Sequence, residues 1–118
     1  MVAIGGALGA MSRYGVALVV ARFWSGQFPL ATFLINITGS FILGFFATFA
    51  VEKTAIDPLW RLLVATGFVG AYTTFSTFEY ETQGLVEAGA VAIALANVIA
   101  SVIAGYIAVQ LGVFLARR

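Results

Sequence analysis

The sequence predicts an all-α integral membrane protein with four transmembrane helices, the third of them broken near its middle. The chain has 118 residues, of which 62% are hydrophobic and 9% charged, whereas soluble domains average about 25% charged residues. Its mean hydropathy is +1.05. Because one span needs about 20 apolar residues, this length accommodates four spans and no soluble domain. We therefore treat residues 1–118 as a single four-span membrane domain.

Composition also excludes several classes of function. The chain contains neither cysteine nor histidine, which excludes disulfides, thiol nucleophiles, most zinc sites and histidine acid–base chemistry. A net charge of +1 provides no basic face for nucleic acid. The inventory does not favour an enzyme.

The first span is expected over residues 2–21. Gly5 and Gly9 form a GxxxG pair, which allows another helix to approach closely. Arg13 lies near mid-depth, where a guanidinium costs at least about 2.5–3.5 kcal/mol on insertion scales. Two interpretations stay open: Arg13 extends to an interface, or it lines an aqueous vestibule and raises the local concentration of anions.

Polar and small residues recur every four positions on two further spans, expected over 30–51 and 90–116. On the second span they are Thr32, Asn36, Ser40, Gly44 and Thr48, and on the fourth they are Asn97, Ser101 and Gly105. Such a ridge lies along one helix face and serves either interhelical hydrogen bonding or an ion path. Asn36 stands out because its carboxamide can donate two hydrogen bonds to an anion.

The third span, expected over residues 59–86, contains four hydroxyl side chains within five residues: Thr73, Thr74, Ser76 and Thr77. A bilayer cannot hydrogen-bond these groups or a loosened backbone, so we expect a helix break around residues 70–74 that faces protein or water. Phe75 and Phe78 share one face of the helix that resumes. Glu79 and Glu81 near its far end indicate either a solvated helix end or a pore mouth.

Taken together, these groups predict a pathway for a small anion. The polar groups inside the membrane can donate hydrogen bonds, and phenyl rings present positive edges. No carboxylate lies at the middle of a span, as a carrier of protons or organic cations would require. Four helices can scarcely enclose a pore alone, so we expect a dimer or larger assembly.

Basic residues give an orientation. Four of them fall on the side of both termini, and only Arg22 clearly falls on the other: the four are Lys53, Arg61, Arg117 and Arg118. The positive-inside rule favours both termini in the cytoplasm.

Three motifs resemble those of the Fluc (CrcB) family of fluoride channels: GGALGAMSRY at 5–14, PLATFLIN at 29–36 and GAYTTFSTF at 70–78. Their order and spacing fit essentially the whole chain. The resemblance implies an antiparallel, dual-topology homodimer in the plasma membrane or bacterial inner membrane. It also implies two pores that conduct fluoride passively and selectively, which lowers cytoplasmic fluoride and gives fluoride resistance.

The same resemblance implies roles for particular residues. The fluoride pore would be lined by Asn36, Phe75, Ser76, Thr77, Phe78, Asn97 and Ser101. Arg13 and Glu81 would lie in the vestibule. A structural Na⁺ at the dimer axis would be held by the backbone carbonyls of Gly70 and Thr73. The chain departs from the family pattern in the break itself, at Ala71 and Tyr72.

Two other classes share some of these features. A small-multidrug-resistance-like antiporter has the same length, four spans and dual topology, but it needs a carboxylate in the first span, where this chain has Arg13. A non-conducting membrane assembly subunit would use the polar ridges only for packing.

Overall fold

The computed structural model describes residues 1–52 and 56–118 and contains only helices in these ranges. Three helices are long and continuous: α1 (Val2–Ala21), α2 (Leu30–Glu52) and α6 (Val91–Ala116). The third segment comprises α3 (Pro58–Arg61), the π-helix η1 (Leu62–Val69), α4 (Gly70–Tyr72) and α5 (Phe75–Glu87). Residues 53–55, which include Lys53 and lie between the second and third predicted spans, are outside the described residues.

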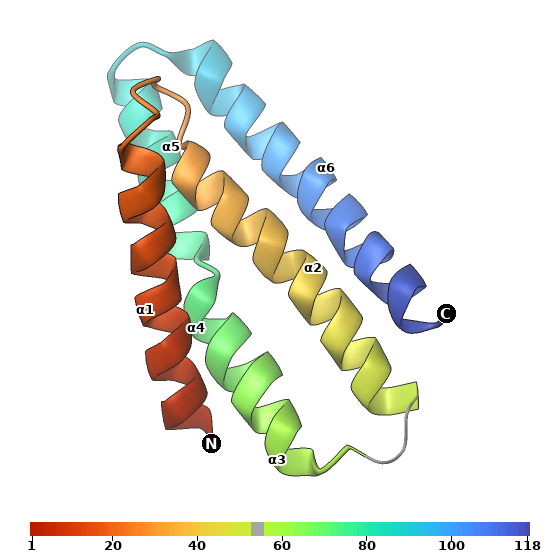
Figure 1. Ribbon diagram of the computed structural model, residues 1–118. Coiled ribbons are helices and arrows are strands. Elements are labelled where there is room, and N and C mark those ends of the chain that lie inside the picture. The colour runs from red at the N-terminus through yellow and green to blue at the C-terminus, as the bar shows by residue number, and fades with distance from the viewer. Residues whose placement is uncertain (53–55) are drawn as a thin grey trace.

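The helices run alternately up and down, so both termini lie away from the α1–α2 loop, with the C-terminus higher than the N-terminus (Figure 1). By length and apolar composition α1, α2 and α6 can each cross a membrane. The 23 residues of α2 extend about 35 Å at 1.5 Å per residue, which exceeds the roughly 30 Å hydrocarbon core of a bilayer. The protein is therefore a multi-pass membrane protein.

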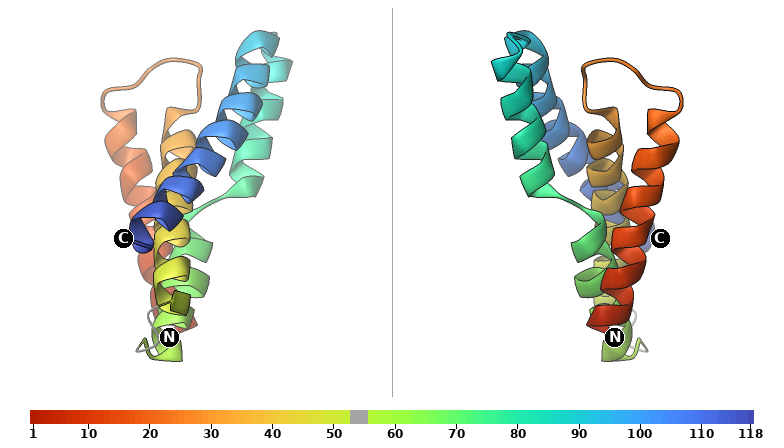
Figure 2. Two further views of the ribbon diagram at one scale, coloured as in Figure 1. Left: turned by 90° about the vertical axis from the view of Figure 1, so that its right-hand side faces the viewer. Right: turned by 90° about the vertical axis from the view of Figure 1, so that its left-hand side faces the viewer.

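The predicted break in the third segment is confirmed. It lies at Thr73 and Thr74, whose backbones are extended, with φ/ψ of −75°/158° and −151°/112°. An extended stretch joins the green and teal halves, which do not share one axis (Figure 2). The π-helix that precedes the break was not expected, since hydrophobic periodicity does not separate it from an α-helix.

Glycines bring α1 into backbone contact with η1. A Cβ added at Gly5 would lie 2.0 Å from the carbonyl oxygen of Leu63, and one added at Gly9 would lie 2.1 Å from that of Phe68. Real Cβ atoms do not approach so closely, so only glycine permits this packing. The GxxxG pair thus serves contact within the chain, as small residues commonly do between membrane helices.

A second close contact joins α2 and α6. A Cβ at Gly44 would lie 2.5 Å from the carbonyl oxygen of Val109, and one at Gly112 would lie 2.4 Å from that of Phe41. The small-residue ridge of α2 is therefore a packing surface toward its C-terminal end.

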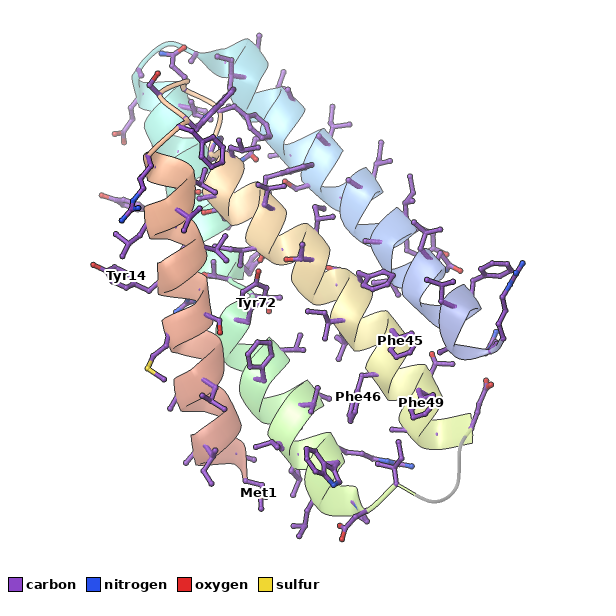
Figure 3. All side chains as sticks on the ribbon, in the orientation of Figure 1. Met1, Tyr14, Phe45, Phe46, Phe49 and Tyr72 are labelled. Atoms are coloured by element: carbon purple, nitrogen blue, oxygen red, sulfur yellow. The ribbon has the colours of Figure 1, made fainter. Side chains whose placement is uncertain are left out.

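The bulky Tyr72 is accommodated by the neighbouring α2. Its hydroxyl lies 2.9 Å from that of Thr38, its ring stacks on Phe68 with centroids 5.7 Å apart, and its Cδ1 is 3.2 Å from where a Gly39 Cβ would be. Tyr72 lies between the helices, whereas Tyr14 projects outward from α1 (Figure 3). Tyr72 is therefore accommodated between the helices without displacing any of the groups that form the break.

Candidate functional site at the helix break

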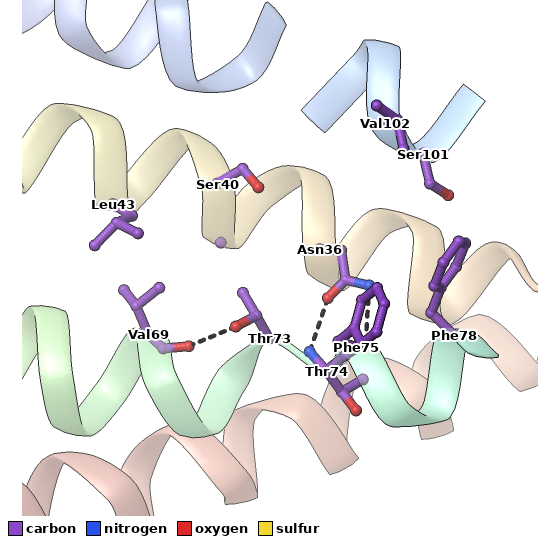
Figure 4. A pocket seen from close by; sticks show the side chains of 11 residues that line it. Asn36, Ser40, Leu43, Val69, Thr73, Thr74, Phe75, Phe78, Ser101 and Val102 are labelled. Atoms are coloured by element: carbon purple, nitrogen blue, oxygen red, sulfur yellow. Dashed lines mark hydrogen bonds between the residues drawn. The ribbon is translucent and has the colours of Figure 1, made fainter. Parts of the chain in front are cut away.

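A cavity of about 300 Å³ lies between α2, the break and α6 (Figure 4). It brings together four of the residues that the resemblance assigned to the pore, from three different spans: Asn36, Phe75, Phe78 and Ser101. The remaining lining residues are Gly39, Ser40, Leu43, Val69, Thr73, Thr74 and Val102. Among the described residues no carboxylate lines it, so its polar side-chain groups there are hydroxyls and a carboxamide.

Both ends of the Asn36 carboxamide are hydrogen-bonded to the backbone of Thr74 at the break. The Thr74 amide donates to Asn36 Oδ1 at 2.8 Å, and Asn36 Nδ2 donates to the Thr74 carbonyl at 3.1 Å. This pairing satisfies backbone groups that a continuous helix would have satisfied internally. It also leaves one N–H of Asn36 for a ligand, instead of the two expected from the sequence.

The hydroxyl-rich stretch restarts the helix. Thr74 Oγ1 accepts from the Thr77 amide at 3.3 Å and donates to Thr77 Oγ1 at 2.9 Å, which makes Thr74 the N-cap of α5. Thr73 Oγ1 instead donates to the Val69 carbonyl at 3.0 Å, behind the break. Ser76 is exposed. Three of the four hydroxyls therefore stabilise the break, a role that hydropathy alone does not reveal.

Phe75 and Phe78 lie one turn apart at the start of α5, with ring centroids 5.8 Å apart and planes 41° apart. Their environments differ strongly. Phe78 is 7% exposed, whereas Phe75 is 73% exposed. In a single chain, therefore, the buried ring of Phe78 closes one side of the cavity, and the side at Phe75 is open.

Arg13 and Glu81 meet in a second cavity of about 320 Å³, which Thr32 and Thr77 also line. Thr32 Oγ1 donates to Glu81 Oε1 at 3.0 Å, and Arg13 Nη1 donates to the Thr73 carbonyl at 3.4 Å. Arg13 thus points to the helix break instead of extending to an interface. Thr74 lines both cavities, so the two adjoin at the break.

Asn97 does not line the cavity. It is 1% exposed, and its Nδ2 donates to Thr82 Oγ1 at 3.0 Å while its Oδ1 accepts from the Ser101 hydroxyl at 3.3 Å. Gly105 lies 3.8 Å, measured from an added Cβ, from Ser40 Oγ on α2. On α6, therefore, Ser101 is the member of the polar ridge that reaches the cavity.

Backbone carbonyls at the break, those of Gly70 and Thr73 among them, lose the amides that a continuous helix would supply. In a continuous helix the Thr74 amide would donate to the Gly70 carbonyl, and the Thr77 amide would donate to the Thr73 carbonyl. Here the Thr74 amide donates to Asn36 Oδ1 and the Thr77 amide donates to Thr74 Oγ1. Carbonyl oxygens at a helix C-terminus carry partial negative charge and suit a hard cation. Among the described residues no cluster of three or more acidic, histidine or cysteine side chains could hold a metal ion.

The fold and the site define a multi-pass membrane protein whose broken third helix frames a cavity of hydrogen-bond donors and aromatic edges. Comparison with known families agrees with this class. The family model described as CrcB-like protein, Camphor Resistance (CrcB), matches residues 1–113. This chain belongs to the CrcB family.

Individual relatives are similar over most of the chain. A protein of a Sulfurihydrogenibium species, named fluoride-specific ion channel FluC, is 41% identical over 99% of this chain and 94% of its own length. Fluoride-specific ion channel FluC 1 of Moorella thermoacetica is 44% identical over 98% of this chain and 82% of its own. FluC 1 of Listeria monocytogenes serotype 4b is 52% identical over 72% of this chain and 68% of its own.

Proposed function

We propose that this chain forms a fluoride-selective ion channel that lets fluoride leave the cell passively and so lowers cytoplasmic fluoride. The observation that supports this most is the cavity at the break, where Asn36, Phe75, Phe78 and Ser101 converge. The family relatives named fluoride-specific ion channels support the choice of anion. The function is transport without covalent chemistry, and the protein is not an enzyme.

A dehydrated anion would be held at this cavity by several weak donors. The free N–H of Asn36, the hydroxyl of Ser40, and the positive edges of Phe75 and Phe78 replace water around a small anion, whereas the Ser101 hydroxyl lines the cavity but donates its proton to Asn97. Such partial compensation lets the ion enter and also leave. Arg13, in the adjoining cavity with Glu81, attracts anions toward the break. Ser76 and Thr77 would continue the pathway along α5.

Passive conduction is distinguished from proton-coupled exchange by the energy source. The first span has Arg13 and no carboxylate, so it lacks the proton-carrying group of a small antiporter. With a potassium ionophore present throughout to carry the compensating charge, fluoride release from liposomes that contain the purified protein should continue at the same rate when a protonophore abolishes the proton gradient. Release that stops without a proton gradient would favour the antiporter.

Conduction requires a second copy of the chain. Phe75 lines the cavity and is 73% exposed in one chain, so the cavity is unprotected at this ring. A second copy packed there would close the pathway, and two-fold symmetry would make two equivalent pathways. We propose an antiparallel pair, as the family resemblance implies, with the two copies inserted in opposite orientations.

Dual topology predicts that each loop is found on both sides of the membrane. In the otherwise cysteine-free chain, Gln27→Cys in the α1–α2 loop should be labelled to about half by a membrane-impermeant maleimide on intact cells, and fully after permeabilisation. Arg118→Cys, at the other end of the helices, should behave identically. If one position labels completely and the other does not label at all, the copies share one orientation.

The break also fits the structural Na⁺ that the resemblance implies. The carbonyl oxygens of Gly70 and Thr73 would hold it, since their helical amide donors are engaged elsewhere. The ion would supply positive charge at the break, where two copies meet. Arg13 Nη1, 3.4 Å from the Thr73 carbonyl, lies beside the same oxygen and adds to that charge.

Asn36→Asp should reduce fluoride flux by at least about tenfold, equivalent to roughly 1.4 kcal/mol. The carboxylate places like charge beside the anion path, and it replaces the N–H that donates to the Thr74 carbonyl by an oxygen. Flux of fluoride from liposomes measures the effect. Asn36→Ala, which removes the pairing without adding charge, should lose less, and unchanged flux in Asn36→Asp would exclude Asn36 from the path.

A further inference from the structure

We propose that Asn97 and Thr82 form a buried hydrogen-bond relay that positions Phe78 and Ser101 on two sides of the cavity. In this assignment Asn97 is a positioning residue and does not touch the ion. The inference rests on the proposed function only for its effect on fluoride flux. The relay itself is a feature of the chain and can be tested without conduction.

Asn97 is the largest fully buried side chain among the described residues, at 1% exposure. Its carboxamide lies between α5 and α6, donating from Nδ2 to Thr82 Oγ1 at 3.0 Å and accepting the Ser101 hydroxyl proton at Oδ1 at 3.3 Å. Because a carboxamide buried in an apolar bundle is costly without partners, both ends of the group are held in place.

Thr82 continues the relay to Phe78. Its Oγ1 accepts from Asn97 and donates to the Phe78 carbonyl at 2.8 Å, one helical turn earlier. A threonine that bonds to the preceding turn is common in membrane helices. Here the same hydroxyl also receives a donor from another helix, which fixes α5 against α6 at the level of the ring. Phe78 is 7% exposed and lines the cavity.

The relay matters because α5 follows the extended residues Thr73 and Thr74 and lacks a continuous helical connection to α4. The position of Phe78 relative to α2 and α6 must therefore be set by contacts of α5 itself. The relay joins Phe78, through Thr82 and Asn97, to Ser101, the cavity residue on α6. One buried amide thus sets the distance between the Phe78 ring and the Ser101 side chain, which line the same cavity.

The test compares Thr82→Val with Thr82→Ser, together with Asn97→Leu and the double variant Thr82→Val/Asn97→Leu. Valine keeps the shape of threonine without its hydroxyl, whereas serine keeps the hydroxyl. Each variant carries 4-fluorophenylalanine at position 78, and in a parallel set at position 114 near the end of α6, for ¹⁹F NMR in detergent. Fluoride release from liposomes is measured on the same variants without the label. Thr66→Val, in η1, is the control for loss of a hydroxyl away from the relay.

We expect the position-78 resonance to shift or broaden in Thr82→Val and Asn97→Leu and to match wild type in Thr82→Ser, with position 114 unchanged. Fluoride flux should fall about three- to tenfold in each of the two disrupting variants, the range expected for one intramembrane hydrogen bond. The double variant should lose no more than the larger single effect, since both changes interrupt one relay.

An unchanged position-78 resonance in Thr82→Val would overturn the relay, whatever happens to the flux. Additive losses in the double variant would also overturn it, because they would mean that Asn97 acts independently, as a lining residue would. If Asn97→Leu fails to fold, the valine and serine pair at position 82 still decides. Because the ¹⁹F readout does not depend on conduction, a protein that releases no fluoride would refute the channel without refuting the relay.

Discussion

Fluoride flux should fall at least about tenfold in Phe75→Ile, equivalent to roughly 1.4 kcal/mol, while the proposed pair of copies remains associated. Phe75 is 73% exposed in the single chain, so its ring contributes little to packing within that chain. Isoleucine is apolar but has no aromatic edge to present to an anion. The expected loss is therefore one of conduction and not of folding.

Liposome efflux and size-exclusion chromatography of the purified variant measure these two quantities separately. Phe114→Ile is the matched control, since Phe114 is also an exposed phenylalanine, at 52%, but lies near the far end of α6. Its flux should equal that of wild type. Phe78→Ile should also lose flux, but Phe78 is 7% exposed and its replacement disturbs packing as well. Wild-type flux in Phe75→Ile would remove that ring from the mechanism.

Gly9→Ala should severely reduce the amount of folded protein. The new Cβ would lie 2.1 Å from the Phe68 carbonyl oxygen, which belongs to backbone and cannot rotate away. Separating α1 from η1 to relieve this overlap costs about 1–3 kcal/mol and moves Arg13, which lies one turn further along α1.

Folded yield and the midpoint of thermal unfolding in detergent are the measurements for this variant. Gly6→Ala is the matched control on the same helix, because a Cβ there meets nothing within 4 Å in the chain. It should leave both quantities near wild type. If Gly9→Ala is as stable as Gly6→Ala, the close contact between α1 and η1 is absent from the folded protein.

The sequence was sufficient for the helical class and the broken third segment, whereas Ser76, Thr77 and Asn97, which the resemblance assigned to the pore, do not line the cavity. Hydroxyl groups between glycines and aromatics predicted the break because a bilayer cannot satisfy them. The structure then places Phe75 and Phe78 beside Asn36 and Ser101. The prediction of the break succeeded because it rests on unmet hydrogen bonds, which a membrane makes costly.

Other features were not accessible from the sequence. The two-ended pairing of Asn36 with Thr74 depends on how α2 lies against the break, and side-chain type alone does not fix that. Asn97 and Ser101 belong to the same four-residue repeat on α6. Asn97 nevertheless bonds to Thr82 of α5 and does not line the cavity, whereas Ser101 does. Periodicity identifies a helix face but not which neighbour covers each of its positions.

The central claim is selectivity for fluoride, and anion efflux from liposomes that contain the purified wild-type protein tests it most directly. Fluoride and chloride electrodes record both ions from the same vesicles, with protein-free vesicles as the baseline. We predict rapid loss of fluoride with chloride release at the baseline. Comparable loss of both ions would contradict selectivity, and release of neither from folded, dimeric protein would favour a non-conducting assembly subunit.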